Sequence, residues 1–108
     1  MTNVIELKEY SLYPGLRYER LGADSGERFR DEVLIPKLGQ NSEVTVVLDG
    51  VLSAPGSSFL EEAFGGLVRK GVPAEVVRAI KLVSVDDPAL IDEIKEYVED
   101  AISCINPR

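Results

Sequence analysis

The sequence predicts an α/β protein with a mixed, partly parallel sheet of about four strands and helices packed on it. Short runs of apolar and β-branched residues alternate with longer segments whose apolar residues recur at helical spacing, and this alternation is typical of a sheet covered by helices. The length of 108 residues and the hydrophobic content of 44% suit one domain, residues 1–108, with its own core.

Four segments are candidate strands. The clearest is 44–48, Val-Thr-Val-Val-Leu, whose continuous apolar character indicates a central strand covered on both faces. Residues 4–7 and 81–85 are the next two. The Pro-Gly pair at 14–15 signals a turn, and the segment 16–21 after it would add a fourth strand at an edge.

The first predicted helix begins after residue 24. Asp24 and Glu27 form a capping-box pattern, and Ser25 is the competing cap. Pro36 should end or kink this helix, because proline lacks an N–H and clashes with the preceding turn. Gly39 is then expected to close it.

The second predicted helix begins at Ser57 or Ser58. Ser58 and Glu61 form another capping-box pattern. Gly65 and Gly66 are unusual inside a helix, where each costs about 1 kcal/mol relative to alanine. They indicate either close packing against the sheet or an early helix end.

A short helix is predicted over 73–79, and a long one follows Asp87, which is expected to cap it, with Pro88 at its first position. Cys104 is expected on the apolar side of this last helix, as a buried and inert thiol. The carboxylates of the opposite face are expected to be solvated rather than to bind a metal. The apolar stripe consists of Leu90, Ile91, Ile94, Tyr97, Val98, Ala101, Ile102 and Ile105.

Charge and composition exclude several functions. Twelve basic and 19 acidic residues give a net charge of −7, which disfavours nucleic acid and anionic membranes. The chain has no histidine, so it offers no Ser-His or Cys-His pair and no imidazole ligand. We therefore expect no enzymatic activity, no metal and no cofactor. With no secretory signal and no apolar run of ~18 residues, the expected location is the cytoplasm.

Four sequence stretches carry a family resemblance: Gly-Leu-Arg at 15–17, Asp-Ser-Gly-Glu-Arg-Phe-Arg at 24–30, Val-Val-Leu-Asp-Gly-Val at 46–51, and Gly-Ser-Ser-Phe-Leu-Glu-Glu-Ala-Phe-Gly-Gly-Leu at 56–67. In these stretches the chain resembles the bacterial STAS-like domains of unassigned function. That group is itself similar to the STAS domains of anti-sigma factor antagonists. The resemblance extends over nearly the whole chain and implies a STAS-like fold.

The resemblance implies a regulatory module that binds a protein partner, a kinase-like ATPase of the anti-sigma class. In the antagonists this partner phosphorylates a serine at the start of the helix after the central strand, and the complex then breaks. Ser57 corresponds to that serine and Ser58 lies beside it. Asp49 matches the aspartate that ends the strand, whereas Gly56 stands where the antagonists have an aspartate.

The partner surface implied by the resemblance comprises Asp49, Gly56, Ser57, Ser58, Phe59, Glu61 and Glu62. A surface of this kind predicts an exposed apolar patch around Phe59 and Leu60. The alternative interpretation of Ser57 and Ser58 is a helix cap, and that of Asp49 is a turn residue.

Two other functions compete with partner binding. Arg17 with the helix start at Ser25 and Gly26 would suit a small anionic ligand or a minor enzyme, with Asp49 as a further candidate, because free N–H groups at a helix start attract anions. The simpler interpretation of these residues is a cap plus a surface ion pair, for instance to Glu27. The third function is formation of a homodimer through an exposed sheet edge near residues 4–10.

Overall fold

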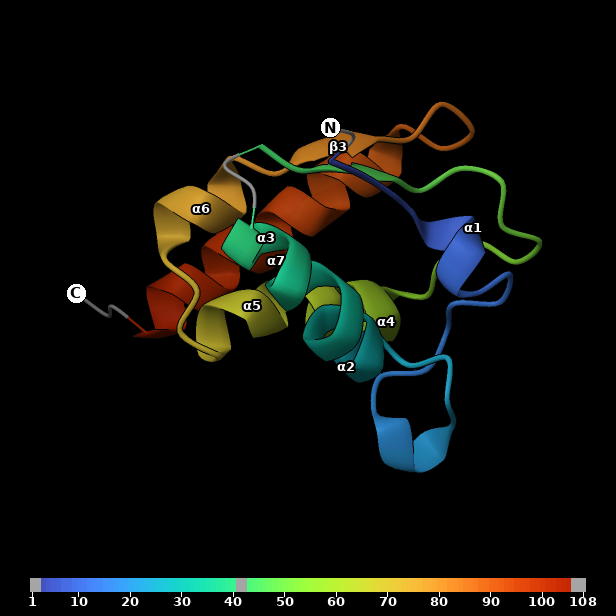
Figure 1. Cartoon of the computed structure of the whole chain (residues 1–108), viewed down its shortest axis with the longest axis horizontal. Helices are drawn as coiled ribbons and strands as arrows, with labels where there is room; N and C mark the ends of the chain where they lie inside the picture. The colour runs from blue at the N-terminus through green and yellow to red at the C-terminus, as the bar shows by residue number, and fades with distance from the viewer. Residues whose placement is uncertain (1–2, 41–42, 106–108) are drawn as a thin grey trace.

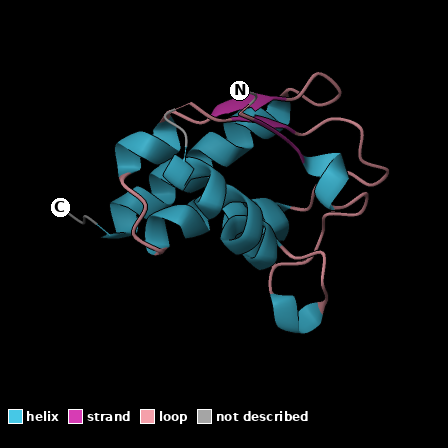
Figure 2. Ribbon diagram, viewed as in Figure 1, coloured by secondary structure: helices cyan, strands magenta, loops and turns pink. Residues whose placement is uncertain are grey.

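The structure is a computed structural model and describes residues 3–40 and 43–105 (Figure 1). Its sheet has three parallel strands in the order β1-β2-β3: β1 is Val4–Glu6, β2 is Thr45–Val47 and β3 is Lys81–Val83. The predicted central strand is confirmed as β2, which lies between the other two. Figure 2 shows the strands along one side of the molecule, with most helices on the other.

The expected fourth strand does not form in the described residues, and both strand pairings are parallel rather than mixed. The segment 16–21 makes one isolated bridge, between Leu16 and Ser25, and then a 3-10 turn over Glu19–Leu21. The carbonyl of Leu16 accepts the N–H of Gly26 at 2.8 Å. The segment therefore pairs with the start of the following helix, so its backbone is not available to the sheet.

The strand β1 is shorter than the predicted edge at residues 4–10. Leu7–Tyr10 forms the helix α1, so only Val4–Glu6 is extended. A three-residue edge offers few backbone groups to a second chain.

The first long helix runs without interruption through α2 (Gly26–Arg28), a π-helical segment (Phe29–Leu34) and α3 (Ile35–Gln40). Pro36 does not end this helix, because it lies within α3. A proline clashes with the carbonyl four residues earlier, which here lies in the wider π-helical segment. The N–H of Ile35 already bonds to the carbonyl of Arg30, five residues back. The wider turn makes room for the proline ring.

Ser25 caps this helix: its Oγ accepts the N–H of Arg28 at 3.1 Å. The capping box predicted for Asp24 and Glu27 is wrong, because both carboxylates are used elsewhere. Asp24 accepts the hydroxyl of Ser11 at 2.8 Å, and Glu27 accepts the N–H of Glu19 at 2.8 Å.

The second long helix comprises α4 (Ser57–Leu60), a π-helical segment (Glu61–Gly65) and α5 (Gly66–Arg69). The helix ends at Arg69, and Gly71 follows with φ of +95°, a conformation typical of the glycine after a helix end. The short helix α6 (Ala74–Arg78) and the long helix α7 (Ala89–Ile105) complete the chain.

Aromatic rings join the two long helices. Phe29 and Phe59 are wholly buried, with ring centroids 5.7 Å apart, and Tyr10 lies 5.0 Å from Phe29. The helices approach so closely that a Cβ on Gly26 would lie 2.3 Å from the carbonyl oxygen of Phe59. Burial of each phenyl ring stabilises the fold by about 1.5–3 kcal/mol.

Leu90, Ile94, Val98 and Ala101 of α7 are buried as the stripe predicts, but Cys104 is exposed. The expectation of a buried thiol is wrong because the last turn of α7 projects beyond the core, where Ile105 is also 48% exposed.

Candidate functional site

The turn after β2 contains Asp49, the first residue of the expected partner surface. Its two carboxylate oxygens accept the backbone N–H groups of Val85 at 3.0 Å and Asp86 at 2.7 Å. The carboxylate thereby ties the end of β2 to the loop after β3. Gly50 completes the turn with φ of +89°, which residues with a Cβ rarely adopt. Asp49 therefore has a structural role at this edge.

A cavity of about 230 Å³ opens beside Asp49, at the carboxyl ends of β2 and β3. This edge is where open parallel sheets usually place their binding sites. The lining combines apolar side chains such as Val51 and Leu90 with the carboxylates of Asp86 and Asp87. Both of these aspartates are exposed. The charge of the cavity favours a cationic group and opposes an anion.

The loop after α1, residues 11–15, and the loop after β2, residues 51–56, run side by side at this end of the molecule. The N–H groups of Leu52 and Ser53 donate to the carbonyl of Leu12 at 2.9 and 3.1 Å, and the N–H of Gly56 donates to the carbonyl of Pro14 at 2.9 Å. Gly56 is in close contact here, since a Cβ on it would lie 3.2 Å from the carbonyl oxygen of Gly15. Gly56 thus permits the loops to pair.

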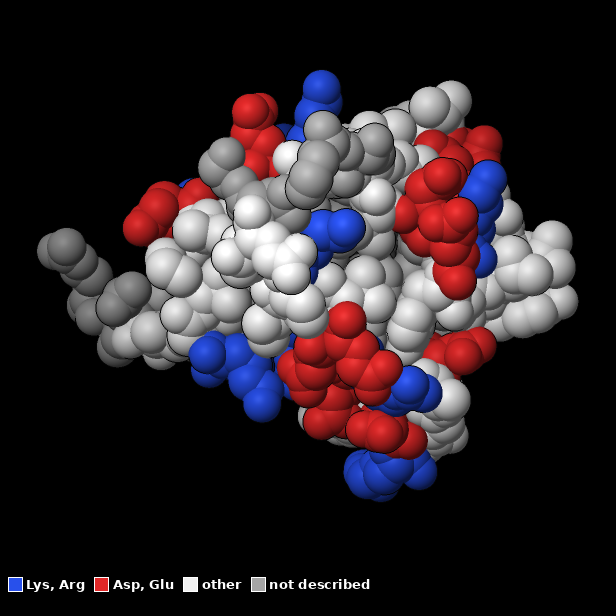
Figure 3. Space-filling model, in the orientation of Figure 1, with Lys and Arg blue, Asp and Glu red and all other residues white. Residues whose placement is uncertain are grey.

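Three large apolar side chains project from these loops. Leu12 is 42% exposed, Tyr13 is 61% exposed and Leu52 is 68% exposed. We call these three residues the paired-loop surface. In Figure 3 the end of the molecule that carries the two loops is uncharged on the face shown. Among the exposed large apolar side chains, Leu52 lies nearest in sequence to Ser57, where α4 begins.

Ser57 and Ser58 follow the same loop and are both exposed at the start of α4. The N-cap is Gly56, and it makes no side-chain cap. The predicted capping box of Ser58 and Glu61 is therefore wrong. Neither serine hydroxyl is needed to cap α4, so the cap interpretation does not account for them.

Ser57 lies against α7. The pKa of the Tyr97 phenol is raised to about 12, first by its hydrogen bond to Glu93 and then by burial, while a hydrogen bond with the Ser57 side chain opposes the rise. Tyr97 donates to Glu93 at 2.5 Å. A negative group on Ser57 would therefore be close to the carboxylate of Glu93.

Phe59 and Leu60 are wholly buried, so the expected apolar patch around them does not exist. They lie on the inner face of α4, beneath the start of α2. The paired loops, by contrast, do expose large apolar side chains, as the segment around Leu21 and the loop at Val85 also do.

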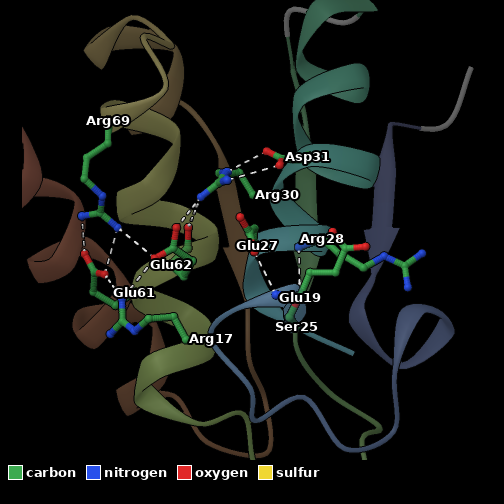
Figure 4. A network of polar contacts seen from close by, with 10 residues as sticks. All are labelled: Arg17, Glu19, Ser25, Glu27, Arg28, Arg30, Asp31, Glu61, Glu62 and Arg69. Atoms are coloured by element: carbon green, nitrogen blue, oxygen red, sulfur yellow. Dashed lines mark hydrogen bonds and ion pairs between the residues drawn. The ribbon is translucent and has the colours of Figure 1, made fainter. Parts of the chain in front are cut away.

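Glu61 and Glu62 are held in a network of arginines (Figure 4). Arg17 donates to Glu61 at 2.6 Å and to Glu62 at 3.2 Å, and Arg69 donates to both oxygens of Glu61 at 2.7 and 2.9 Å. The hydrogen bond from Arg69, and then that from Arg17, hold the pKa of Glu61 below its usual value against the effect of burial. Arg30 binds Glu62 from the other side. Both carboxylates are therefore engaged in ion pairs within the fold.

The same contacts remove the basis of the anion site. Arg17 is paired with Glu61 and Glu62, rather than with Glu27, and its carbonyl accepts the N–H of Glu27 at 3.0 Å. Ser25 is wholly buried, and the N–H of Gly26 donates to the carbonyl of Leu16. The backbone N–H groups of the helix start are therefore bonded within the chain, which argues against the alternative of an anionic-ligand site at Arg17, Ser25 and Gly26.

Leu12, Tyr13 and Leu52 were missed by the sequence-based prediction. The available signal was the presence of large apolar residues inside segments rich in Pro, Gly and Ser, where no helical or strand periodicity requires them. Within residues 3–40 and 43–105 no group of carboxylates and thiols is arranged to hold a metal ion. No helix in that part of the chain has the length and apolar character to cross a membrane.

The comparisons with known proteins are consistent with this architecture. Residues 25–90 match the model of a family described as STAS-like domain of unknown function (DUF4325). The match begins at the cap of α2, passes through β2, α4 and β3, and ends at the start of α7. No curated protein and no solved structure matches the chain significantly. Because the match covers more than half of the sequence, the chain belongs to this family of STAS-like domains.

Proposed function

We propose that the chain is a regulatory module that binds a protein partner through the paired-loop surface and the start of α4. The observation that carries the proposal is the exposure of Leu12, Tyr13 and Leu52 on two hydrogen-bonded loops, with Ser57 and Ser58 at the end of one of them. Exposed apolar side chains that lie together are typical of interaction sites. In this proposal the chain is not an enzyme, needs no cofactor and works in the cytoplasm.

The surroundings of the paired-loop surface suggest what the partner presents. An uncharged apolar tip fits an apolar hollow, and the acidic cavity at Asp86 and Asp87 fits a lysine or arginine beside it. The net charge of −7 adds long-range attraction for a basic face. A small anion fits none of these features.

The family resemblance supplies the partner class. The partner would be a kinase-like ATPase of the anti-sigma type, and Ser57 would be its phosphorylation site. Ser57 is exposed, and Gly56, which precedes it, has no side chain and so places no acidic group beside it. A phosphate there would add roughly two negative charges beside Glu93 and would repel a partner by charge and bulk without refolding the domain.

Affinity capture from the lysate of the native host, followed by mass spectrometry, tests the proposal. The baits are the wild type, Leu52→Asp and Ile105→Asp. Ile105 is 48% exposed on the last turn of α7, at the opposite end of the molecule in Figure 1, so its substitution is a matched control. We expect an ATPase-like protein on the wild type and on Ile105→Asp, and its loss on Leu52→Asp. Equal capture by all three baits would refute the proposed surface.

A further inference from the structure

A second cavity lies between α6, β3 and α7, away from the paired loops. Its volume is about 300 Å³, at the lower end of the roughly 300–1,000 Å³ of small-molecule sites. Its floor is made by core side chains, among them Phe64 and Ile94, each only 1% exposed. Protein cores are close-packed and rarely leave such a space, and apolar cavities take up apolar ligands.

The mouth of this cavity carries three charged side chains, Arg78, Lys95 and Glu99. Arg78 of α6 donates to both oxygens of Glu99 of α7, at 2.8 and 2.9 Å. The charges of Arg78 and Glu99 cancel each other, and the pair joins the two helices across the mouth. Lys95 lies one turn before Glu99 and has no hydrogen bond or ion pair within the described residues. The uncompensated charge at the mouth is therefore a single cation.

We infer that this cavity binds a small monocarboxylate with an apolar tail. The tail occupies the floor formed by Phe64, Ile94 and Val98, and the carboxylate binds the ammonium of Lys95 at the mouth. A neutral ligand of the same shape would gain only the apolar burial, and an amine would be repelled by Lys95. This site is independent of the proposed partner surface and lies in a different part of the fold.

Octanoate, octanol and octylamine are suitable probes, because they share one chain length and differ in the charge of the head. Burial of the tail predicts a dissociation constant on the order of 0.1–1 mM for octanoate. In a titration of ¹⁵N-labelled protein, we expect saturable shifts of amide resonances in residues 77–82 and 94–99. Octanol should bind more weakly, and octylamine more weakly still. Absence of saturable shifts, or shifts in other segments, would overturn the inference.

Two charge-reversal variants distinguish the contribution of the Lys95 ammonium from that of the apolar cavity. Lys95 is exposed, so Lys95→Glu should fold normally and weaken octanoate roughly three- to tenfold while leaving octanol unchanged. Lys81→Glu makes the same change on an exposed lysine that does not line the cavity, and should leave octanoate binding as in the wild type. Equal affinities of octanoate for the two variants would show that Lys95 does not recognise the carboxylate.

Discussion

Arg30 and Glu62 form a buried ion pair that joins the two long helices. The Nη1 atom of Arg30 lies 2.5 Å from the Oε2 atom of Glu62, and the two side chains are only 4% and 10% exposed. Burial opposes the charge on Arg30, but hydrogen bonds to Asp31 and Glu62 outweigh it and raise the pKa of the guanidinium. Each π-helical segment contributes one partner, so the pair fixes the two wide turns against each other.

Removing one partner of this pair should be costly. Glu62→Leu leaves the charge of Arg30 buried with less compensation, and such losses typically cost about 3–5 kcal/mol. The double variant Arg30→Met/Glu62→Leu should recover most of that loss, because apolar groups of similar volume can replace a buried pair. Urea denaturation of the two single variants and the double variant measures the coupling. Additive effects of the single changes would contradict the role assigned to the pair.

Gly66 should not tolerate a methyl group. Alanine is favoured over glycine in a helix by about 1 kcal/mol, yet a Cβ at Gly66 would lie 2.6 Å from the Nη1 atom of Arg30. We therefore expect Gly66→Ala to lower the free energy of unfolding. Gly39→Ala is the control, because nothing lies within 4 Å of a Cβ there, and it should raise the free energy of unfolding by about 0.5–1 kcal/mol. The same sign for both changes would refute the close approach.

Tyr10 should make stability depend on alkaline pH. Burial raises the pKa of its phenol from 10.0 to about 12, so the folded protein holds this proton more tightly than the unfolded chain. Its contribution to stability is complete below pH 10.0 and is lost as the pH rises toward 12. The pKa of Tyr97 is also raised to about 12. Its effect on stability is the same in the wild type and in a variant that lacks only the Tyr10 phenol, so it cancels when the two are compared.

Tyr10→Phe removes this titration. The variant also loses the hydrogen bonds from the phenol to the carbonyls of Ala23 and Ser25, so it should be less stable at neutral pH. Between about pH 9 and 12, however, its free energy of unfolding should fall less steeply than that of the wild type. Denaturation curves at several pH values provide the measurement. Parallel pH profiles would contradict the raised pKa.

Ser57→Glu should weaken partner binding and leave the fold intact. A negative charge at a helix N-terminus is favourable by about 0.3–1 kcal/mol, and the nearby Glu93 opposes it, so the net change in stability should be small. Calorimetry with the captured partner should show at least about a tenfold loss of affinity, in line with charge effects at interfaces. Ser103→Glu, an exposed serine on the last turn of α7, is the control away from the paired-loop surface. Equal losses for the two variants would indicate a general charge effect rather than a role of Ser57.

The sequence predicts β2 and Ser25 correctly for local reasons. The β-branched run at 44–48 is stable only inside a sheet. Ser25 can cap a helix with one hydroxyl, and its neighbour Asp24 is taken by Ser11. Local signals of this kind are enough to place the elements and the loop that leads to Ser57.

Other features could not be predicted because they depend on contacts between distant residues. Glu62 pairs with Arg17 and Arg30, which lie 45 and 32 residues away, and no local pattern marks them as partners. Phe59 follows two serines at a helix start, a place typical of the surface, yet its ring packs against those of Phe29 and Tyr10. The exposure of Leu52 depends in the same way on the pairing of its loop with Leu12.

Chemical-shift mapping of the ¹⁵N-labelled protein with its captured partner tests the central claim most directly. The account predicts that shifts and line broadening concentrate in residues 11–15 and 51–58, with smaller changes at Asp86 and Asp87. Changes confined to α6 and α7, or to the edge of β1, with residues 11–15 and 51–58 unaffected, would contradict the assignment of the paired-loop surface as the site of partner binding.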